Sequence, residues 1–252
     1  MTEVIALCAF ALLAGFVDAI AGGGGLIQVP ALFAIFPTVG PPLLLGTNKF
    51  SALTGTTVAT LRYGWSVPIQ WRLAIPAAAI AGFAAVAGAK TVTLIEIAIL
   101  RPLLLVLLGI MVVYTLARPH LGKAAEGSGR SGTASFLALG AVFGFYDGFF
   151  GPGAGSVLMF ALVRWFGFDF LRAAAMTKVL NLTTNFCALL LFAWTQNVLY
   201  AVALPMAACN VCGGFVGAHL AVRGGSSFIR AVFLIVTIAL MLKVLADVLK
   251  GG

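Results

Sequence analysis

Charged residues are scarce in this sequence: Asp, Glu, Lys and Arg make up only 9% of its 252 residues, against roughly a quarter in a soluble domain. This scarcity excludes an ordinary soluble fold. The short alternating segments of a membrane β-barrel are missing too, whereas long apolar runs are present, with 62% hydrophobic residues and a mean hydropathy of +1.13. Because helices and closed barrels are the structures that span bilayers, the sequence predicts an all-α polytopic membrane protein.

Motifs for nucleotide binding and catalysis are also missing. The chain has no G-x-x-x-x-G-K-[ST], H-E-x-x-H or G-x-S-x-G pattern, which argues against ATP-driven pumping and against an intramembrane enzyme. Its two histidines, His120 and His219, lie in a polar linker and near a helix end, so neither joins a catalytic set. The four cysteines all lie in apolar runs and are expected to pack as small hydrophobic side chains. We therefore expect no enzyme, no cofactor and no metal site.

The basic residues do not form a nucleic-acid-binding patch. The net charge is +8, but these residues are scattered at the ends of apolar runs, where they indicate membrane topology. The N-terminus, Met1-Thr-Glu-Val, lacks the basic flank of a cleavable signal, so the first apolar run is expected to remain as a helix. The expected partners are membrane lipids and a small substrate, and a homodimer is left open.

The chain contains one distinctive stretch twice. Residues 15–25, GFVDAIAGGGG, correspond to residues 144–154, GFYDGFFGPGA, at an offset of 129. Five residues of the first copy, Gly15, Phe16, Asp18, Gly22 and Gly24, reappear as Gly144, Phe145, Asp147, Gly151 and Gly153. At the same offset, Lys49, Pro76, Gly88 and Arg101 match Lys178, Pro205, Gly217 and Arg230. Several residue types in one register indicate an internal duplication.

The duplication divides the chain into two homologous halves, each beginning with a helix that glycines interrupt. We expect a first membrane repeat over 1–117, a polar cytoplasmic linker over 118–133 and a second repeat over 134–252, with about eight to ten membrane segments at ~20 residues each. The expected apolar segments are 4–21, 26–36, 43–61, 72–89 and 94–117, then 135–150, 156–168, 172–194, 198–220 and 228–249.

Charge distribution favours halves of inverted orientation. If each half crosses the membrane an odd number of times and the linker is inside, nine basic residues face the cytoplasm and four face outward, as the positive-inside rule requires. Parallel halves would give no bias. The nine are Arg62, Arg72, Arg118, Lys123, Arg130, Arg164, Arg172, Arg223 and Arg230; the four are Lys90, Arg101, Lys243 and Lys250.

Four ionisable residues lie within apolar segments: Asp18, Lys49, Asp147 and Lys178. A charge at the bilayer centre is costly unless it is paired or hydrated, so such residues usually mark a transport path. One interpretation is structural, with an Asp18–Lys49 pair and an Asp147–Lys178 pair each holding one half together. The other is functional: each lysine serves an anionic substrate, and each aspartate orients the site or exchanges protons.

The glycine breaks favour the functional interpretation. A helix that starts after Gly22, Gly23, Gly24 and Gly25, or after Gly151 and Gly153, presents unpaired N–H groups and the positive end of its dipole. Helix starts of this kind bind anions, and broken helices in the two halves of a transporter indicate its binding site. The alternative is that the glycines only allow close helix packing.

Polar side chains accompany both lysines. Lys178, Asn181 and Asn185 fall at i, i+3 and i+7, on one face of a helix, where the amides can donate to an oxyanion. Lys49 follows Thr47 and Asn48, so the two half-sites are related but unequal.

These residues resemble the TauE/SafE family of anion transporters, and in particular its YfcA-like members. The resemblance rests on Gly22–Gly25, Thr47-Asn-Lys49, Gly151-Pro-Gly153 and Lys178, and it covers nearly the whole chain. It implies a multi-pass protein of the bacterial inner membrane that moves a small sulfur-containing anion, such as sulfite, an organosulfonate or sulfoacetate. It fixes neither the substrate nor the direction of transport.

The leading hypothesis is therefore a secondary transporter. The anion is expected at the membrane midplane between the two helix starts and Lys49 and Lys178, with proton coupling through Asp18 and Asp147 as the expected energy source. A passive anion channel and a permease for a non-sulfur organic anion are the alternatives. A scaffold protein would need no intramembrane charge.

Overall fold

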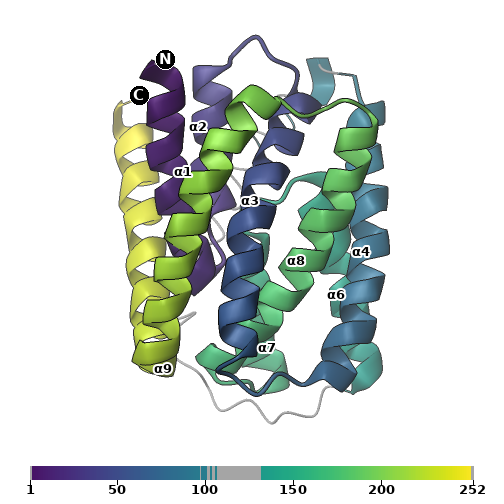
Figure 1. Ribbon diagram of the computed structural model, residues 1–252, viewed down its shortest axis with the longest axis vertical. Helices are drawn as coiled ribbons and strands as arrows, with labels where there is room; N and C mark the ends of the chain where they lie inside the picture. The colour runs from purple at the N-terminus through teal and green to yellow at the C-terminus, as the bar shows by residue number, and fades with distance from the viewer. Residues whose placement is uncertain (1, 97, 101–102, 104–105, 107–131, 251–252) are drawn as a thin grey trace.

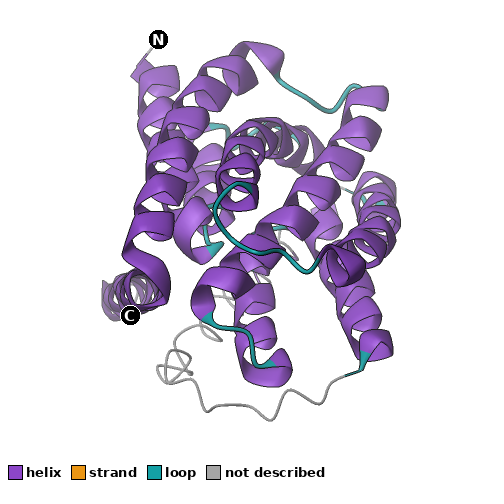
Figure 2. Cartoon of the chain, turned by 60° about the horizontal axis from the view of Figure 1, so that its bottom comes forward, coloured by secondary structure: helices purple, strands orange, loops and turns teal. Residues whose placement is uncertain are grey.

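The computed structural model describes residues 2–96, 98–100, 103, 106 and 132–250 (Figure 1). These residues form helices joined by short loops, and no strand occurs among them (Figure 2). The helices are α1 (Thr2–Ala21), α2 (Gly25–Ile35), α3 (Pro41–Gly64), α4 (Trp71–Leu94), α6 (Thr133–Phe149), α7 (Ala154–Phe166), α8 (Phe170–Trp194) and α9 (Tyr200–Lys250). The predicted all-α fold is confirmed.

The observed helices follow the predicted segments within a few residues. Both predicted breaks are present, between α1 and α2 and between α6 and α7. The predicted segments 198–220 and 228–249 are joined in α9, which is kinked at Gly225, where φ is 65° and ψ is −165°. Most of the segment predicted over 94–117 and nearly all of the linker predicted over 118–133 lie outside the described residues.

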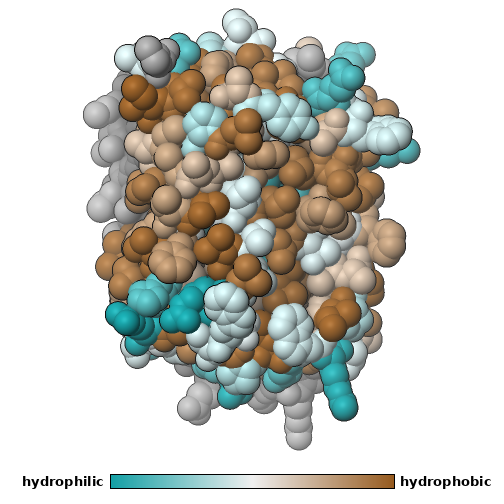
Figure 3. Space-filling view, in the orientation of Figure 1, coloured by the Kyte–Doolittle hydropathy of each residue, from teal (hydrophilic) through white to brown (hydrophobic). Residues whose placement is uncertain are grey.

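Four of the described helices are long and apolar enough to cross a membrane: Thr2–Ala21, Trp71–Leu94, Phe170–Trp194 and Tyr200–Val232. Of the four helices that flank the two breaks, α1 is one of these long helices. The other three, α2, α6 and α7, are apolar but shorter. Hydrophobic side chains cover the middle of the face in Figure 3, and hydrophilic ones gather toward its ends. An exposed apolar belt of this kind fits a lipid environment.

Local sequence explains where several helices begin and end. Pro41 and Pro42 occupy the first positions of α3, where a missing N–H costs nothing. Asp169 caps α8: its side chain accepts a hydrogen bond from the Arg172 backbone N–H at 3.0 Å. Gly167, with φ of 69°, ends α7 in the left-handed conformation that closes many helices.

The two halves interlock, because the first helix of each half packs against the last described helix of the other. Helix α1 lies along α9, and α6 lies along α4. A Cβ added at Gly88 of α4 would collide with the Phe145 carbonyl oxygen of α6, and one at Gly217 of α9 would collide with the Phe16 carbonyl oxygen of α1. Both members of this second contact lie 129 residues from those of the first. Small residues let the backbones approach this closely, and the duplication is thus visible in the packing.

The equivalent helices α3 and α8 run antiparallel (Figure 1). The start of α3 meets the loop before α9, since the Leu199 backbone N–H donates to Thr47 Oγ1 at 2.9 Å. The start of α8 meets the loop between α3 and α4, since Arg172 and Gln70 line one pocket. The opposite directions of α3 and α8 support the prediction that the two halves are inverted.

Candidate functional site

The two glycine breaks meet in the middle of the molecule. Gly22 and Gly151, equivalent by the repeat, both adopt left-handed backbone conformations, with φ of 74° and 92°. This conformation is strained for any residue with a Cβ. Gly22 also contacts the start of α7 directly: its carbonyl oxygen accepts a hydrogen bond from the Ser156 backbone N–H at 3.1 Å. The first break therefore lies against the helix start that follows the second break.

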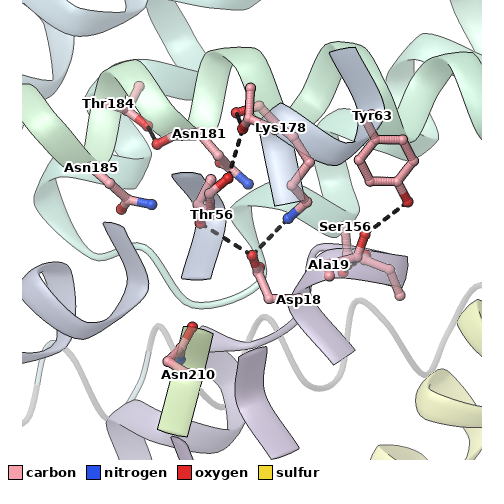
Figure 4. A network of polar contacts seen from close by, with 12 residues as sticks. Asp18, Ala19, Thr56, Tyr63, Ser156, Lys178, Asn181, Thr184, Asn185 and Asn210 are labelled. Carbon is pink, nitrogen blue, oxygen red and sulfur yellow. Dashed lines mark hydrogen bonds and ion pairs between the residues drawn. The ribbon is translucent and has the colours of Figure 1, made fainter. Parts of the chain in front are cut away.

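The four charges of the apolar segments, three of them buried and Asp18 partly exposed, form two ion pairs that cross between the halves. Lys178 Nζ of α8 lies 2.7 Å from Asp18 Oδ2 of α1 (Figure 4). Lys49 Nζ of α3 lies 2.9 Å from Asp147 Oδ2 of α6. The structural interpretation, with Asp18–Lys49 and Asp147–Lys178 pairs inside each half, is therefore wrong about the partners. The physical reason is the interlocked packing, which brings the acid-bearing helix of each half against the lysine-bearing helix of the other.

The two pairs differ in their surroundings. Lys49 is 3% exposed and also donates to Asn185 Oδ1 at 2.9 Å, while Asp147 Oδ2 accepts from Thr184 Oγ1 at 2.6 Å. The Asp18 side chain is 22% exposed, and its further contact, from Thr56 Oγ1, is long at 3.5 Å. A hydrogen-bonded pair is better compensated in a low-dielectric interior, so Lys49–Asp147 is the more firmly held of the two.

A central cavity adjoins both breaks and both aspartates. Its volume open to a water molecule is about 30 Å³, enough for roughly two waters. Besides small residues it is lined by two acids, one lysine and five amide side chains, which are Asp18, Asp147, Lys49, Gln28, Asn48, Asn181, Asn185 and Asn210. The small residues that line it are Ala14, Gly22, Gly24, Gly25, Ala52, Gly151 and Gly155. Such a lining can hydrogen-bond an anion and balance its charge.

Most of the residues predicted for the site line this cavity, and four do not. Gly23, Gly153 and Lys178 are absent from its lining, although Lys178 contacts Asp18, which does line it. Thr47 is fully buried elsewhere: its hydroxyl donates to the Leu43 carbonyl oxygen at 2.6 Å and accepts from Leu199 N–H. Its role in this structure is to tie α3 to the loop before α9.

Two amides of the cavity were missed in the sequence, Gln28 and Asn210. Gln28 lies one turn after the first glycine break, and Asn210 is a single amide within a long apolar run. Both are buried, and Asn210 Nδ2 donates to Gln28 Oε1 at 3.0 Å. An uncharged amide in an apolar run is a weaker sequence feature than a charge. Because burying it is also costly, it too can indicate a functional site.

Comparison with known proteins identifies relatives along nearly the whole chain. The family model described as "Sulfite exporter TauE/SafE" matches residues 7–244. The chain is 37% identical over 237 residues to "Probable membrane transporter protein ORF9" of Sinorhizobium sp, covering 94% of this chain and 90% of that protein. It is 35% identical over 237 residues to "Probable membrane transporter protein YfcA" of Escherichia coli K12, covering 94% and 87%. No solved structure matches the chain.

Proposed function

Because the chain belongs to the TauE/SafE family of membrane transporters, we propose that it is a secondary transporter for a small sulfur-containing anion, such as sulfite, a sulfonate or sulfoacetate. The observation that carries this proposal is the two ion pairs that cross between the halves beside a small polar cavity. The proposed location is a bacterial inner membrane, with the Arg-rich end that bears Arg62, Arg72, Arg164 and Arg172 toward the cytoplasm.

Charge balance suggests how transport is coupled to protons. Two lysines and two aspartates make the site neutral as it stands. An added anion would leave a net negative charge in a low-dielectric region, which is costly. A proton on Asp18 or Asp147 removes that excess and releases the paired lysine, whose ammonium group can then bind the anion. One proton for each negative charge of the substrate keeps the loaded site neutral.

The small cavity fits the same sequence of events. At about 30 Å³ it is nearly filled by its own side chains, so an anion larger than a few water molecules needs the ion pairs to open. Asp18 is the more accessible of the two acids, since 22% of its side chain is exposed and its pair has fewer supporting hydrogen bonds. Opening that pair on substrate binding couples the two halves.

Reconstituted liposomes test the proposal. Purified protein should accumulate labelled sulfite or a sulfonate against its concentration gradient when a pH gradient is imposed, with saturation. An electrical potential alone should have little effect, because the proton and the anion cross together. Lys178→Ala should abolish the flux while the protein stays in the membrane. Unsaturable flux that only follows the electrochemical gradient would instead identify a channel. Unimpaired flux in Lys178→Ala would show that the Asp18–Lys178 pair takes no part in transport and would refute the proposed coupling.

A further inference from the structure

The two helix starts at the glycine breaks are not equally free. At α7, the Ser156 backbone N–H donates to the Gly22 carbonyl oxygen at 3.1 Å, and Ser156 Oγ donates to the Ala21 carbonyl oxygen at 2.7 Å. The end of α1 thus contacts the first turn of α7, where the Gly155 N–H is left without a hydrogen bond among the described residues and Gly155 lines the cavity. At α2, the N–H groups of Gly24 and Gly25 make no hydrogen bond among the described residues, and both glycines line the cavity.

The side chain of Gln28 adds an unused donor at the free helix start. It is 1% exposed and lines the cavity, and its Nε2 atom has no hydrogen-bond partner in the described part of the chain. A buried donor without a partner is costly, and in a native protein it calls for a ligand or water. The cavity beside it has room for either.

Asn210 determines which end of the Gln28 amide faces the cavity. Its Nδ2 donates both to the Ala11 carbonyl oxygen at 3.1 Å and to Gln28 Oε1 at 3.0 Å. The backbone carbonyl can only accept, so it fixes the orientation of the Asn210 amide. With Asn210 donating, Gln28 must present its oxygen to Asn210 and keep its NH₂ for the cavity. In the view of Figure 4, Asp18 lies between Asn210 and Lys178.

The repeat shows that this pair of amides, Gln28 of the first half and Asn210 of the second, has no equivalent pair. The residues equivalent to Gln28 and Asn210 at the offset of 129 are Val157 and Ala81, which have no polar side-chain atom. Lys49 lines the cavity and its counterpart Lys178 does not. Other differences lie on the opposite side: Asn181 and Asn185 of α8 line the cavity where α3 has Ala52 and Thr56. The free donor of Gln28, however, has no counterpart at the start of α7.

From these observations we propose that Gln28 is a substrate-binding residue. Its Nε2 donates to an oxygen of a small oxyanion held at the start of α2, beside the backbone N–H groups of Gly24 and Gly25 and the Lys49 ammonium group. Asn210 is the positioning residue that turns the Gln28 amide toward the cavity. The protein therefore has one oxyanion subsite rather than two equivalent ones. This inference deepens the proposed function and rests on it for the existence of an anionic substrate.

Binding measurements on the purified full chain in detergent test the subsite. The probes are sulfite, methanesulfonate, sulfate and acetate. Gln28→Met keeps the length of the side chain and removes the donor, so affinity for the bound oxyanion should fall about 10- to 100-fold, the usual value of a hydrogen bond to a charged group. Gln28→Glu should weaken binding further, because its carboxylate repels the anion. Val157→Ala, the matched control at the equivalent position of α7, should bind as the unaltered protein does.

A double-mutant cycle tests the role of Asn210. Asn210→Ala introduces the residue found at the equivalent position and should weaken binding, but it should add little to the loss already caused by Gln28→Met, because it acts through Gln28. A melting curve shows whether Gln28→Met and Gln28→Glu fold. The affinity of either variant, if it folds, is enough to test the subsite. Unchanged affinity in a folded Gln28 variant overturns the subsite, and so does the absence of binding by all four probes. Gln28-dependent binding of acetate alone would keep the subsite and refute the sulfur specificity.

Discussion

The two halves of this protein share a backbone plan but differ in the side chains that it carries. Gly22 and Gly151 have the same left-handed conformation, and each aspartate reaches the lysine of the opposite half. Yet the buried amides Gln28 and Asn210, which line the cavity, have only Val157 and Ala81 as counterparts, and the start of α7 is contacted by the end of α1. The comparison teaches that the repeated elements build the frame, and the differences between them select where a ligand binds.

The largest expected difference between the halves concerns the two lysines. Lys49→Met leaves Asp147 almost fully buried without its cation, and breaking a buried pair from one side costs about 3–5 kcal/mol. Lys178→Met leaves Asp18, which is 22% exposed and can be hydrated in part, so its cost should be smaller. Transport should be lost in both. Melting temperatures in detergent and flux in liposomes measure the two effects.

A double variant separates charge from function in this comparison. Lys49→Met with Asp147→Asn removes both charges, so stability should return toward that of the unaltered protein, since an uncharged pair avoids the unpaired buried acid. Flux should stay lost. Recovery of flux would mean that the ion pair only holds the halves together, and equal destabilisation by the two single lysine variants would remove the proposed difference between the pairs.

A smaller difference is expected at the glycine breaks. Gly22→Ala has two costs. The left-handed conformation is strained by about 1–2 kcal/mol, and the new Cβ, 2.5 Å from the Gly155 carbonyl carbon, adds about 1–3 kcal/mol of overpacking. In Gly151→Ala the closest atom is the Asp147 carbonyl oxygen at 3.3 Å, which leaves mainly the strain. Melting curves should therefore show a larger loss for Gly22→Ala. Equal losses would mean that the backbones at the first break can separate freely.

Much of this architecture could be predicted from the sequence. The apolar runs, the two glycine breaks and the 129-residue repeat predict the described helices and the residues around the cavity, because burial, helix breaking and duplication all leave local patterns. The partner of each charge could not be predicted. Asp18 is closer in sequence to Lys49, but it pairs with Lys178, since α1 and α8 meet only after the halves interlock.

The amide pair was missed for a related reason. Gln28 and Asn210 are 182 residues apart, and neither has a polar counterpart in the repeat, so no sequence pattern joins them. Thr47 shows the opposite error: its place beside Asn48 and Lys49 suggested a ligand, but its side chain points to a loop contact with Leu199. Sequence proximity to a functional residue does not fix the direction of a side chain on a helix.

The smallest expected difference concerns Tyr63, whose equivalent in the second half is Phe192. Both are fully buried, but the Tyr63 hydroxyl donates to the Ala19 carbonyl oxygen of α1 at 2.9 Å. Tyr63→Phe makes the first half resemble the second at this position and should cost about 0.5–1.5 kcal/mol, the net value of an ordinary hydrogen bond. Substrate affinity and flux should not change, because neither residue lines the cavity. Thermal melting with a parallel flux assay measures both, and a loss of flux would show that the position of α1 just before its break must be held by this bond for the site to work.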